Sequence, residues 1–215
     1  MNTFTIADAF SHGWQKTKQH FWLTAGVLVS YAAISIAIGR VGEMAKENVV
    51  LNIVAFMISI ALGVAIKIGF TRYFLNADED KGSYNDLYTM GGVFFTYFVA
   101  YVLLSLITVA GLFLLVVPGI IIALIYFFVP TLIIDRGLEV GEAFKESAAM
   151  TKGHRLHLLG FALVSVLLNF VGVLVVVVGL LVTVPVTCFG GVYIYRKLLG
   201  AEMPVVIPEQ SNPEA

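Results

Sequence analysis

Residues 91–134 contain no charged side chain, and this run limits the possible fold more than any other feature of the sequence. As one helix, these 44 residues would be about 66 Å long, twice the thickness of a bilayer's hydrocarbon core. They do not alternate polar and apolar side chains as barrel strands do. Apolar segments in lipid satisfy their peptide groups by forming helices. We therefore predict an all-α, polytopic integral membrane protein in which this run folds back on itself.

Two shorter charge-poor runs precede it. Residues 21–39 carry no charge, and residues 49–70 carry only Lys67. A span needs about 20 apolar residues, so each run suffices for one crossing. Lys67 lies near the end of its run, from which a long side chain can reach the headgroups. We therefore expect no ionisable group near the middle of any span.

Proline and glycine mark the place where the 91–134 run reverses. Pro118 cannot donate a backbone hydrogen bond, and Gly119 is free to adopt a positive φ. We expect the fold-back at this pair, between a third span at about 92–116 and a fourth at about 119–134.

The fourth span is short and contains Pro130, so we expect it to kink or to end early. The last apolar run, residues 156–195, includes only His157 as a group that titrates near neutral pH. It is again too long for one crossing, and we expect its turn near 172–179. Together the runs predict about six spans.

The Lys and Arg residues give the orientation, since they collect in cytoplasmic loops. With six spans, the side opposite both termini holds only Arg40 and Lys46. Both termini are therefore predicted to be cytoplasmic. Charged residues make up 13% of the chain, about half the share in soluble domains, and the net charge of -1 does not indicate nucleic-acid binding. The basic residues assigned to the cytoplasmic side are Lys16, Lys18, Lys67, Arg72, Lys81, Arg136, Lys145, Lys152, Arg155, Arg196 and Lys197.

A motif recurs at an offset of 134 residues, each time just before a hydrophobic hairpin. The segment 6–10 reads IADAF and the segment 140–144 reads VGEAF, while a weaker copy stands at 86–88. We therefore hypothesise a unit that consists of an interfacial helix and a transmembrane hairpin. Further matches at the same offset are Thr17 with Thr151, Lys18 with Lys152, His20 with His154, and Gly26 with Gly160.

The first interfacial helix is predicted over residues 6–19. Its apolar side chains recur with helical spacing on one face, and Thr5 or Asp8 can satisfy free N–H groups at its start. Such a helix lies in the bilayer interface with its apolar face on lipid. The predicted apolar face consists of Ile6, Ala9, Phe10, Gly13, Trp14 and Thr17.

The three units are expected at about 4–75, 83–136 and 138–200, within a single membrane domain of residues 1–200. The tail 201–215 contains three prolines and few apolar residues, so we expect it to be disordered.

Residues 83–200 resemble the YciC-like family of bacterial inner-membrane proteins, and also the membrane domain attached to some glycerophosphodiester phosphodiesterases. The resemblance implies an inner-membrane location and no particular activity, because the family has no settled function. The phosphodiesterases carry their chemistry in a separate soluble domain, and no region here is long and polar enough to match it. The similar residues are Pro118, Gly119, Pro130, Asp135, Ala143, Phe144, Ser147, Lys152 and Gly153.

Few side chains suggest chemistry. His154 and His157 have a spacing that suits a metal but lack a third ligand, and Asp135 could serve an ion or pair with Arg136. Cys188 is the only cysteine. We expect no catalytic residue, no metal and no cofactor. An intramembrane enzyme acting on lipids would require Asp135, His154 and His157 to converge on one pocket.

The acidic segment 78–80 is expected to be a solvated turn. The leading hypothesis is a non-enzymatic protein that organises membrane lipids or partner proteins, including further copies of itself. The alternative is a small transporter or channel for a neutral or amphipathic substrate, which a lipid-sized cavity between the units would favour. Candidates for binding anionic lipid headgroups are Lys16, Lys18, Lys145, Lys152 and Arg155.

Overall fold

The computed structural model describes residues 4–44, 49–89, 91–114, 116–175 and 179–202, and their regular elements are helices. Two 3₁₀ helices, η1 (Tyr84–Leu87) and η2 (Gly91–Val93), precede α4. The α-helices in this part of the chain are α1 (Ile6–Gln19), α2 (Phe21–Met44), α3 (Val49–Asp78), α4 (Phe94–Leu114), α5 (Val116–Ile125), α6 (Val129–Arg136), α7 (Val140–Thr151), α8 (Arg155–Leu174) and α9 (Leu180–Glu202).

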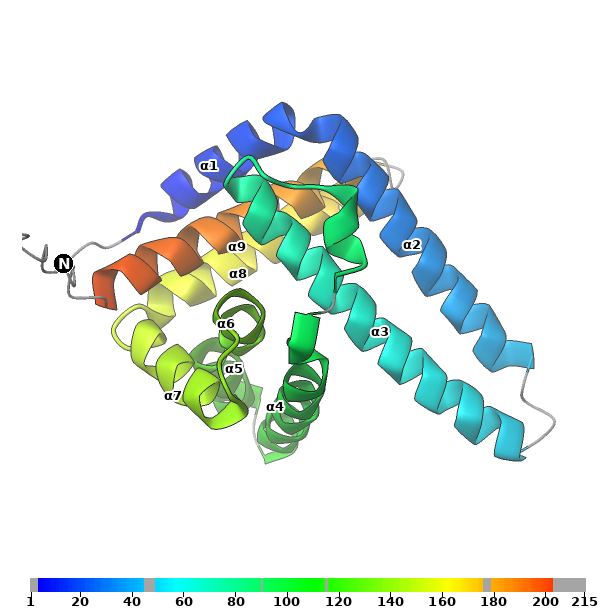
Figure 1. Cartoon of the computed structure of the whole chain (residues 1–215). Coiled ribbons are helices and arrows are strands. Elements are labelled where there is room, and N and C mark those ends of the chain that lie inside the picture. Colours follow the sequence, from blue (N-terminus) through cyan, green and yellow to red (C-terminus); the bar gives the residue numbers. More distant parts are fainter. Residues whose placement is uncertain (1–3, 45–48, 90, 115, 176–178, 203–215) are drawn as a thin grey trace, which may run out of the picture.

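Helices that follow one another along the chain pack as antiparallel pairs (Figure 1). α2 and α3 make a long hairpin that extends away from the rest of the molecule, α4 packs on α5, and α8 lies beside α9. The largest buried side chains lie where α3, α6 and α9 meet, and they include Tyr73, Phe128, Phe189 and Tyr195. The outer half of the α2–α3 hairpin exposes its apolar side chains, as a lipid-facing surface does.

Several helices are long and apolar enough to cross a membrane, which confirms the predicted class of helical membrane protein. Among the described residues there are four such helices, or five if α1 and α2, which meet at 93°, count as one bent span. The four are Ile53–Asp78, Phe94–Gly111, Val117–Arg136 and Arg155–Leu174. Lys46, residues 176–178 and most of the expected tail lie outside the described residues.

α3 is longer than the predicted span. The apolar run ends at Phe70, but the helix continues to Asp78 and the candidate span is Ile53–Asp78. Lys67 lies inside this candidate span, three residues before the end of its apolar run, and the expectation that no ionisable group lies near the middle of a span stays a prediction. Its ammonium group donates to the Tyr101 hydroxyl at 3.0 Å.

The fold-back between α4 and α5 lies a few residues before the predicted place. α4 ends at Leu114, and Pro118 lies in the first turn of α5, where a missing N–H costs no helical hydrogen bond. Gly119 does not have a positive φ. It lies against Gly111, where an added Cβ would be only 3.0 Å from the Gly119 Cα, so this glycine pair lets the two helices approach closely.

The predicted break at Pro130 is confirmed, since α5 ends at Ile125 and α6 begins at Val129. A proline at this position cannot donate to the carbonyl four residues earlier and collides with it. The break leaves the Ile125 carbonyl oxygen without its helical partner. α7 provides the substitute, because the Ser147 and Thr151 hydroxyls donate to this oxygen at 2.9 and 3.1 Å.

α1 and α7 have the same arrangement at the offset of 134 residues. α1 begins at residue 6 and α7 at 140, while the helices that follow begin at 21 and 155. The weaker third copy forms only the single 3₁₀ turn η1. The buried residues of α1 and their equivalents in α7, also buried, are Ala9 with Ala143, Gly13 with Ser147, and Thr17 with Thr151.

α1 begins as predicted, with the Thr5 hydroxyl accepting from the Asp8 N–H. Its small-residue face, however, packs on α9 and is not free to lie on lipid. The two helices run antiparallel in close contact, with Ala9 near Gly190 and Gly13 against Val186. The small side chains explain this arrangement, because they let two backbones touch. Trp14, also assigned to this face, remains exposed.

Candidate functional site

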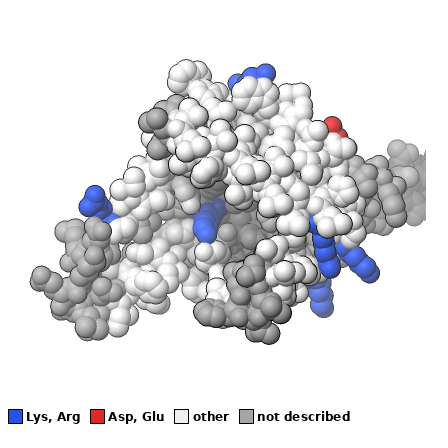
Figure 2. Space-filling view, turned by 180° about the vertical axis from the view of Figure 1, so that it is seen from behind, with Lys and Arg blue, Asp and Glu red and all other residues white. Residues whose placement is uncertain are grey.

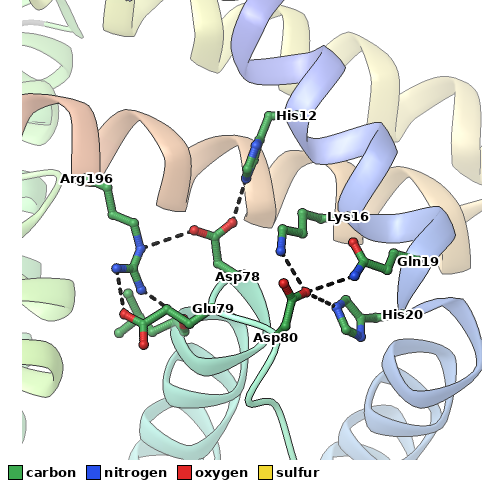
Figure 3. Close-up of polar contacts among 9 residues, drawn as sticks. His12, Lys16, Gln19, His20, Asp78, Glu79, Asp80 and Arg196 are labelled. Carbon is green, nitrogen blue, oxygen red and sulfur yellow. Dashed lines mark hydrogen bonds and ion pairs between the residues drawn. The ribbon is translucent and has the colours of Figure 1, made fainter.

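A cluster of polar side chains joins three helices that are far apart in the sequence (Figure 3). We call it the polar cluster. Three members come from α1 and one is its C-cap residue, three come from the end of α3 and the turn after it, and one comes from α9. They are His12, Lys16, Gln19, His20, Asp78, Glu79, Asp80 and Arg196.

Asp78 is the most buried carboxylate of the polar cluster, with 8% of its side chain exposed. One carboxylate oxygen lies 2.6 Å from His12 Nε2, and the other lies 3.1 Å from Arg196 Nε. The Arg196 guanidinium also donates to Glu79 at 2.8 Å and to the Leu75 carbonyl at 3.0 Å. Asp78 therefore connects α1 to α9 at the end of α3.

Asp80 forms the second part of the polar cluster and is 54% exposed. Its Oδ1 lies within 3.0 Å of donors on Lys16, Gln19 and His20. The hydrogen bonds from Lys16 and His20 hold the pKa of the Asp80 carboxyl below its ordinary value. Hydrogen bonds from Lys81 and Arg196 lower the pKa of Glu79 in the same way. Both carboxylates are thus ionised at neutral pH and paired with basic groups.

A cavity of about 400 Å³ lies next to the polar cluster, within the usual range for small-molecule sites. Its walls come from α3, the α5–α6 break, α6, α8 and α9, and hence from all three of the predicted units. Most of the lining is apolar and aromatic. The lining residues are Phe70, Thr71, Phe74, Phe127, Phe128, Thr131, Phe161, Ala162, Ser165, Thr187, Cys188, Gly191 and Val192.

A few polar atoms in and beside this cavity have no partner. Within the described residues the buried Ser165 hydroxyl makes no hydrogen bond, although it lines the cavity. One turn further along α8, the side-chain oxygen of Asn169 is also unpartnered, while its nitrogen lies 3.5 Å from the Thr187 hydroxyl. Unpartnered buried polar atoms are costly and favour a ligand or water that can bond to them.

The polar cluster holds two walls of the cavity together. Asp78 lies one helical turn beyond the cavity residue Phe74 on α3, and Arg196 lies one turn beyond Val192 on α9. Phe74 also packs edge-on against Phe189, with ring centroids 4.8 Å apart. Loss of the Asp78 contacts should therefore loosen α9 from α3 where the cavity closes.

The structure divides the basic residues that were candidates for headgroup binding. Lys16 forms an ion pair with Asp80, and the Lys18 ammonium group lies 5.3 Å from the centre of the Trp14 ring. Lys145, Lys152 and Arg155 are exposed and make no ion pair with another described residue. Figure 2 shows a largely uncharged face, with several basic side chains gathered at the end where Figure 1 places α7.

The candidate metal and catalytic residues do not form a reactive site in the described part of the chain. His154 and His157 pack on the Phe4 ring at 6.1 and 5.9 Å. Asp135 accepts a hydrogen bond from the Tyr195 hydroxyl at 2.7 Å, while Arg136 pairs with Glu146 and not with Asp135. No group of three His, Cys, Asp or Glu residues that could hold a metal occurs among the described residues.

The other residues that carry the family resemblance build one corner of the fold. Pro130 sets the α5–α6 break, and Phe144 of α7 packs on Tyr126 within that break at 4.9 Å. Gly153 has a φ of 85°, which only glycine adopts freely, and it separates α7 from α8. These residues shape the chain at this corner.

Sequence reasoning missed both the polar cluster and the cavity. The acidic turn was expected to be solvated, yet Asp78 is buried and Asp80 binds side chains of α1 and of its C-cap residue His20. One signal was available, because His12, Lys16 and His20 recur every four residues along one polar face and can bond to the carboxylates of the turn. The cavity depends on helix packing and has no comparable signal in the sequence.

Comparisons with protein-family models, curated proteins and solved structures find no match to this chain.

Proposed function

We propose that this protein is a non-enzymatic, six-span protein of the bacterial inner membrane that binds an amphipathic, lipid-like substrate, as a small carrier does. The observation that carries the proposal is the cavity where the three predicted units meet. Its apolar lining suits a hydrocarbon chain, and its few hydroxyl groups suit a polar substituent. The resemblance to the YciC-like family is compatible with this role and adds no activity to it.

The cavity shifts the balance between the two functions considered from the sequence. A tightly packed bundle would have favoured a protein that only organises its surroundings, whereas about 400 Å³ of space favours a bound substrate. The unpartnered Ser165 and Asn169 oxygens lie on the same side of α8, one turn apart. They supply hydrogen-bonding positions for an uncharged part of the substrate.

In the six-span topology, α2 and α9 each cross the membrane as well. They are added to the helices that are long and apolar enough to span it. With both termini in the cytoplasm, the polar cluster and the α6–α7 corner share the cytoplasmic side. The test uses single cysteines at Gly39 and Ser83 in a Cys188→Ser background. In intact spheroplasts a membrane-impermeant maleimide should label the cysteine at 39, and label the one at 83 only after permeabilisation. The opposite pattern would contradict the orientation.

A second candidate function is the organisation of anionic lipids at the cytoplasmic surface. It is favoured by the exposure of Lys145, Lys152 and Arg155, none of which is paired with another described residue. Each such residue contributes about 1 kcal/mol to binding an anionic membrane surface. This function and the proposed carrier function are compatible, since they use different surfaces.

The proposed substrate binding is tested by filling the cavity. Gly191 lines it, and a Cβ at this position meets nothing within 4 Å, so Gly191→Trp should place an indole in the cavity without striking the backbone. Gly63→Trp is the matched control, because Gly63 also faces open space but does not line the cavity. In native mass spectrometry from mild detergent, the wild type and Gly63→Trp should retain one lipid-sized adduct that Gly191→Trp lacks. Equal adducts in all three proteins would refute the proposal.

A further inference from the structure

Lys67 is an ionisable group inside a candidate span. It lies among the apolar residues of the span Ile53–Asp78, three positions before the apolar run ends at Phe70. A positive charge among apolar side chains is costly unless it is solvated or paired, so such a residue is a candidate binding group for a charged substrate.

The contacts of Lys67 compensate only part of this cost. Its Nζ donates to the Tyr101 hydroxyl at 3.0 Å and lies 4.2 Å from the centre of the Tyr101 ring. Tyr97 stacks on Tyr101 with a centroid separation of 6.5 Å. Within the described residues no carboxylate pairs with Lys67. The aromatic pair orients the ammonium group and leaves its net charge in place.

The position of Lys67 on α3 links it to the cavity. Phe70, Thr71 and Phe74 line the cavity and follow Lys67 by three, four and seven residues, so all four lie on one face of the helix. Lys67 and Thr71 are separated by about 6 Å along the helix axis. Lys67 does not itself line the cavity, and it continues the cavity-lining face of α3 by one turn at the end remote from the polar cluster.

We infer that Lys67, oriented by Tyr101, binds the anionic head of an amphiphile whose hydrocarbon chain occupies the cavity. The head is a carboxylate or a phosphate, since either accepts a charge-assisted hydrogen bond from an ammonium group. This inference rests on the proposed function and adds the charge of the substrate to it. The sequence pointed to a neutral or amphipathic substrate because Lys67 was placed at the membrane surface.

The test compares two ligands that share one chain and differ in charge. Binding of palmitate and of hexadecanol is measured at pH 8 to the full-length protein in nanodiscs of zwitterionic lipid. The wild type and Lys67→Arg should bind palmitate at least about tenfold more tightly than hexadecanol. Lys67→Met should lose this preference and bind both ligands alike. Repeating the comparison with hexadecyl phosphate in place of palmitate shows whether the site binds a phosphate or a carboxylate more tightly.

Folding and binding are kept apart by a second readout. Removing an incompletely paired charge from the span should leave the thermal stability of Lys67→Met unchanged or raised, whereas a purely structural Lys67 would make this variant less stable. Lys67→Gln repeats the comparison if the methionine variant does not fold.

A preference for palmitate that persists without the charge would overturn the inference. Equal binding of both ligands by the wild type, abolished by Gly191→Trp, would also overturn it but leave the proposed function intact. Binding of neither ligand would count against both.

Discussion

Gly13→Ala is expected to destabilise the protein by about 2 kcal/mol or more, although the same change usually stabilises a helix by up to about 1 kcal/mol. A Cβ on Gly13 would overlap the carbonyl oxygen of Val186 and come within 3.2 Å of the Gly190 nitrogen. These are backbone atoms of α9, which cannot move aside as the end of a flexible side chain can. The steric cost therefore outweighs the gain in helix propensity, and α1 must separate from α9.

Thermal unfolding in detergent measures this effect, and Gly141→Ala is the matched control. Gly141 lies on the exposed face of α7, where a new Cβ meets nothing within 4 Å. The control should be as stable as the wild type or slightly more stable. If the two alanine variants unfold at the same temperature, the close contact of α1 with α9 does not exist as described.

Asp78→Ala is expected to cost about 3 kcal/mol, because breaking a buried ion pair leaves its partners unpaired. The side chain is 8% exposed and lies against both His12 and Arg196, so its loss removes one contact of α3 with α1 and one with α9. We also expect the variant to retain less of the bound lipid, because the walls of the cavity are no longer braced.

The control for Asp78 is Asp80→Ala in the same polar cluster. Asp80 is 54% exposed, and water screens its pairing with Lys16. Its loss should change the unfolding temperature far less than the loss of Asp78, and should leave lipid retention as in the wild type. A larger effect at Asp80 than at Asp78 would mean that burial does not govern the strength of this cluster.

The elements that the sequence predicts well depend on local physics. The four candidate spans follow from uncharged length, the break before α6 follows from Pro130, and the start of α1 follows from the Thr5 cap. In each case the determining residues lie within one or two turns of the feature. Nothing in the rest of the fold has to be known to place them.

The features that the sequence does not predict depend on distant segments. α3 continues past its apolar run because the polar residues of its last turns are bonded by other helices, as Asp78 is by His12 and Arg196. Those partners are 66 and 118 positions away in the chain. The contact of Lys67 with Tyr101, 34 positions away, likewise depends on a distant segment and has no signal in the sequence.

The packing of α1 shows a second limit of sequence reasoning. Helical spacing placed Ala9, Gly13 and Thr17 on one face, and all three are indeed buried together. Spacing alone cannot tell whether such a face meets lipid or another helix. The small size of these residues was the available clue, because close helix contact needs small side chains whereas lipid favours large ones.

The most direct measurement is an experimental density map of the protein purified from its native membrane in mild detergent. We predict elongated density between α3, α6, α8 and α9, bordered by Phe74 and Phe161, with its polar end toward Lys67 and Tyr101. A cavity that is closed by its own side chains, with the Lys67 ammonium group turned out to the membrane surface, would contradict this prediction.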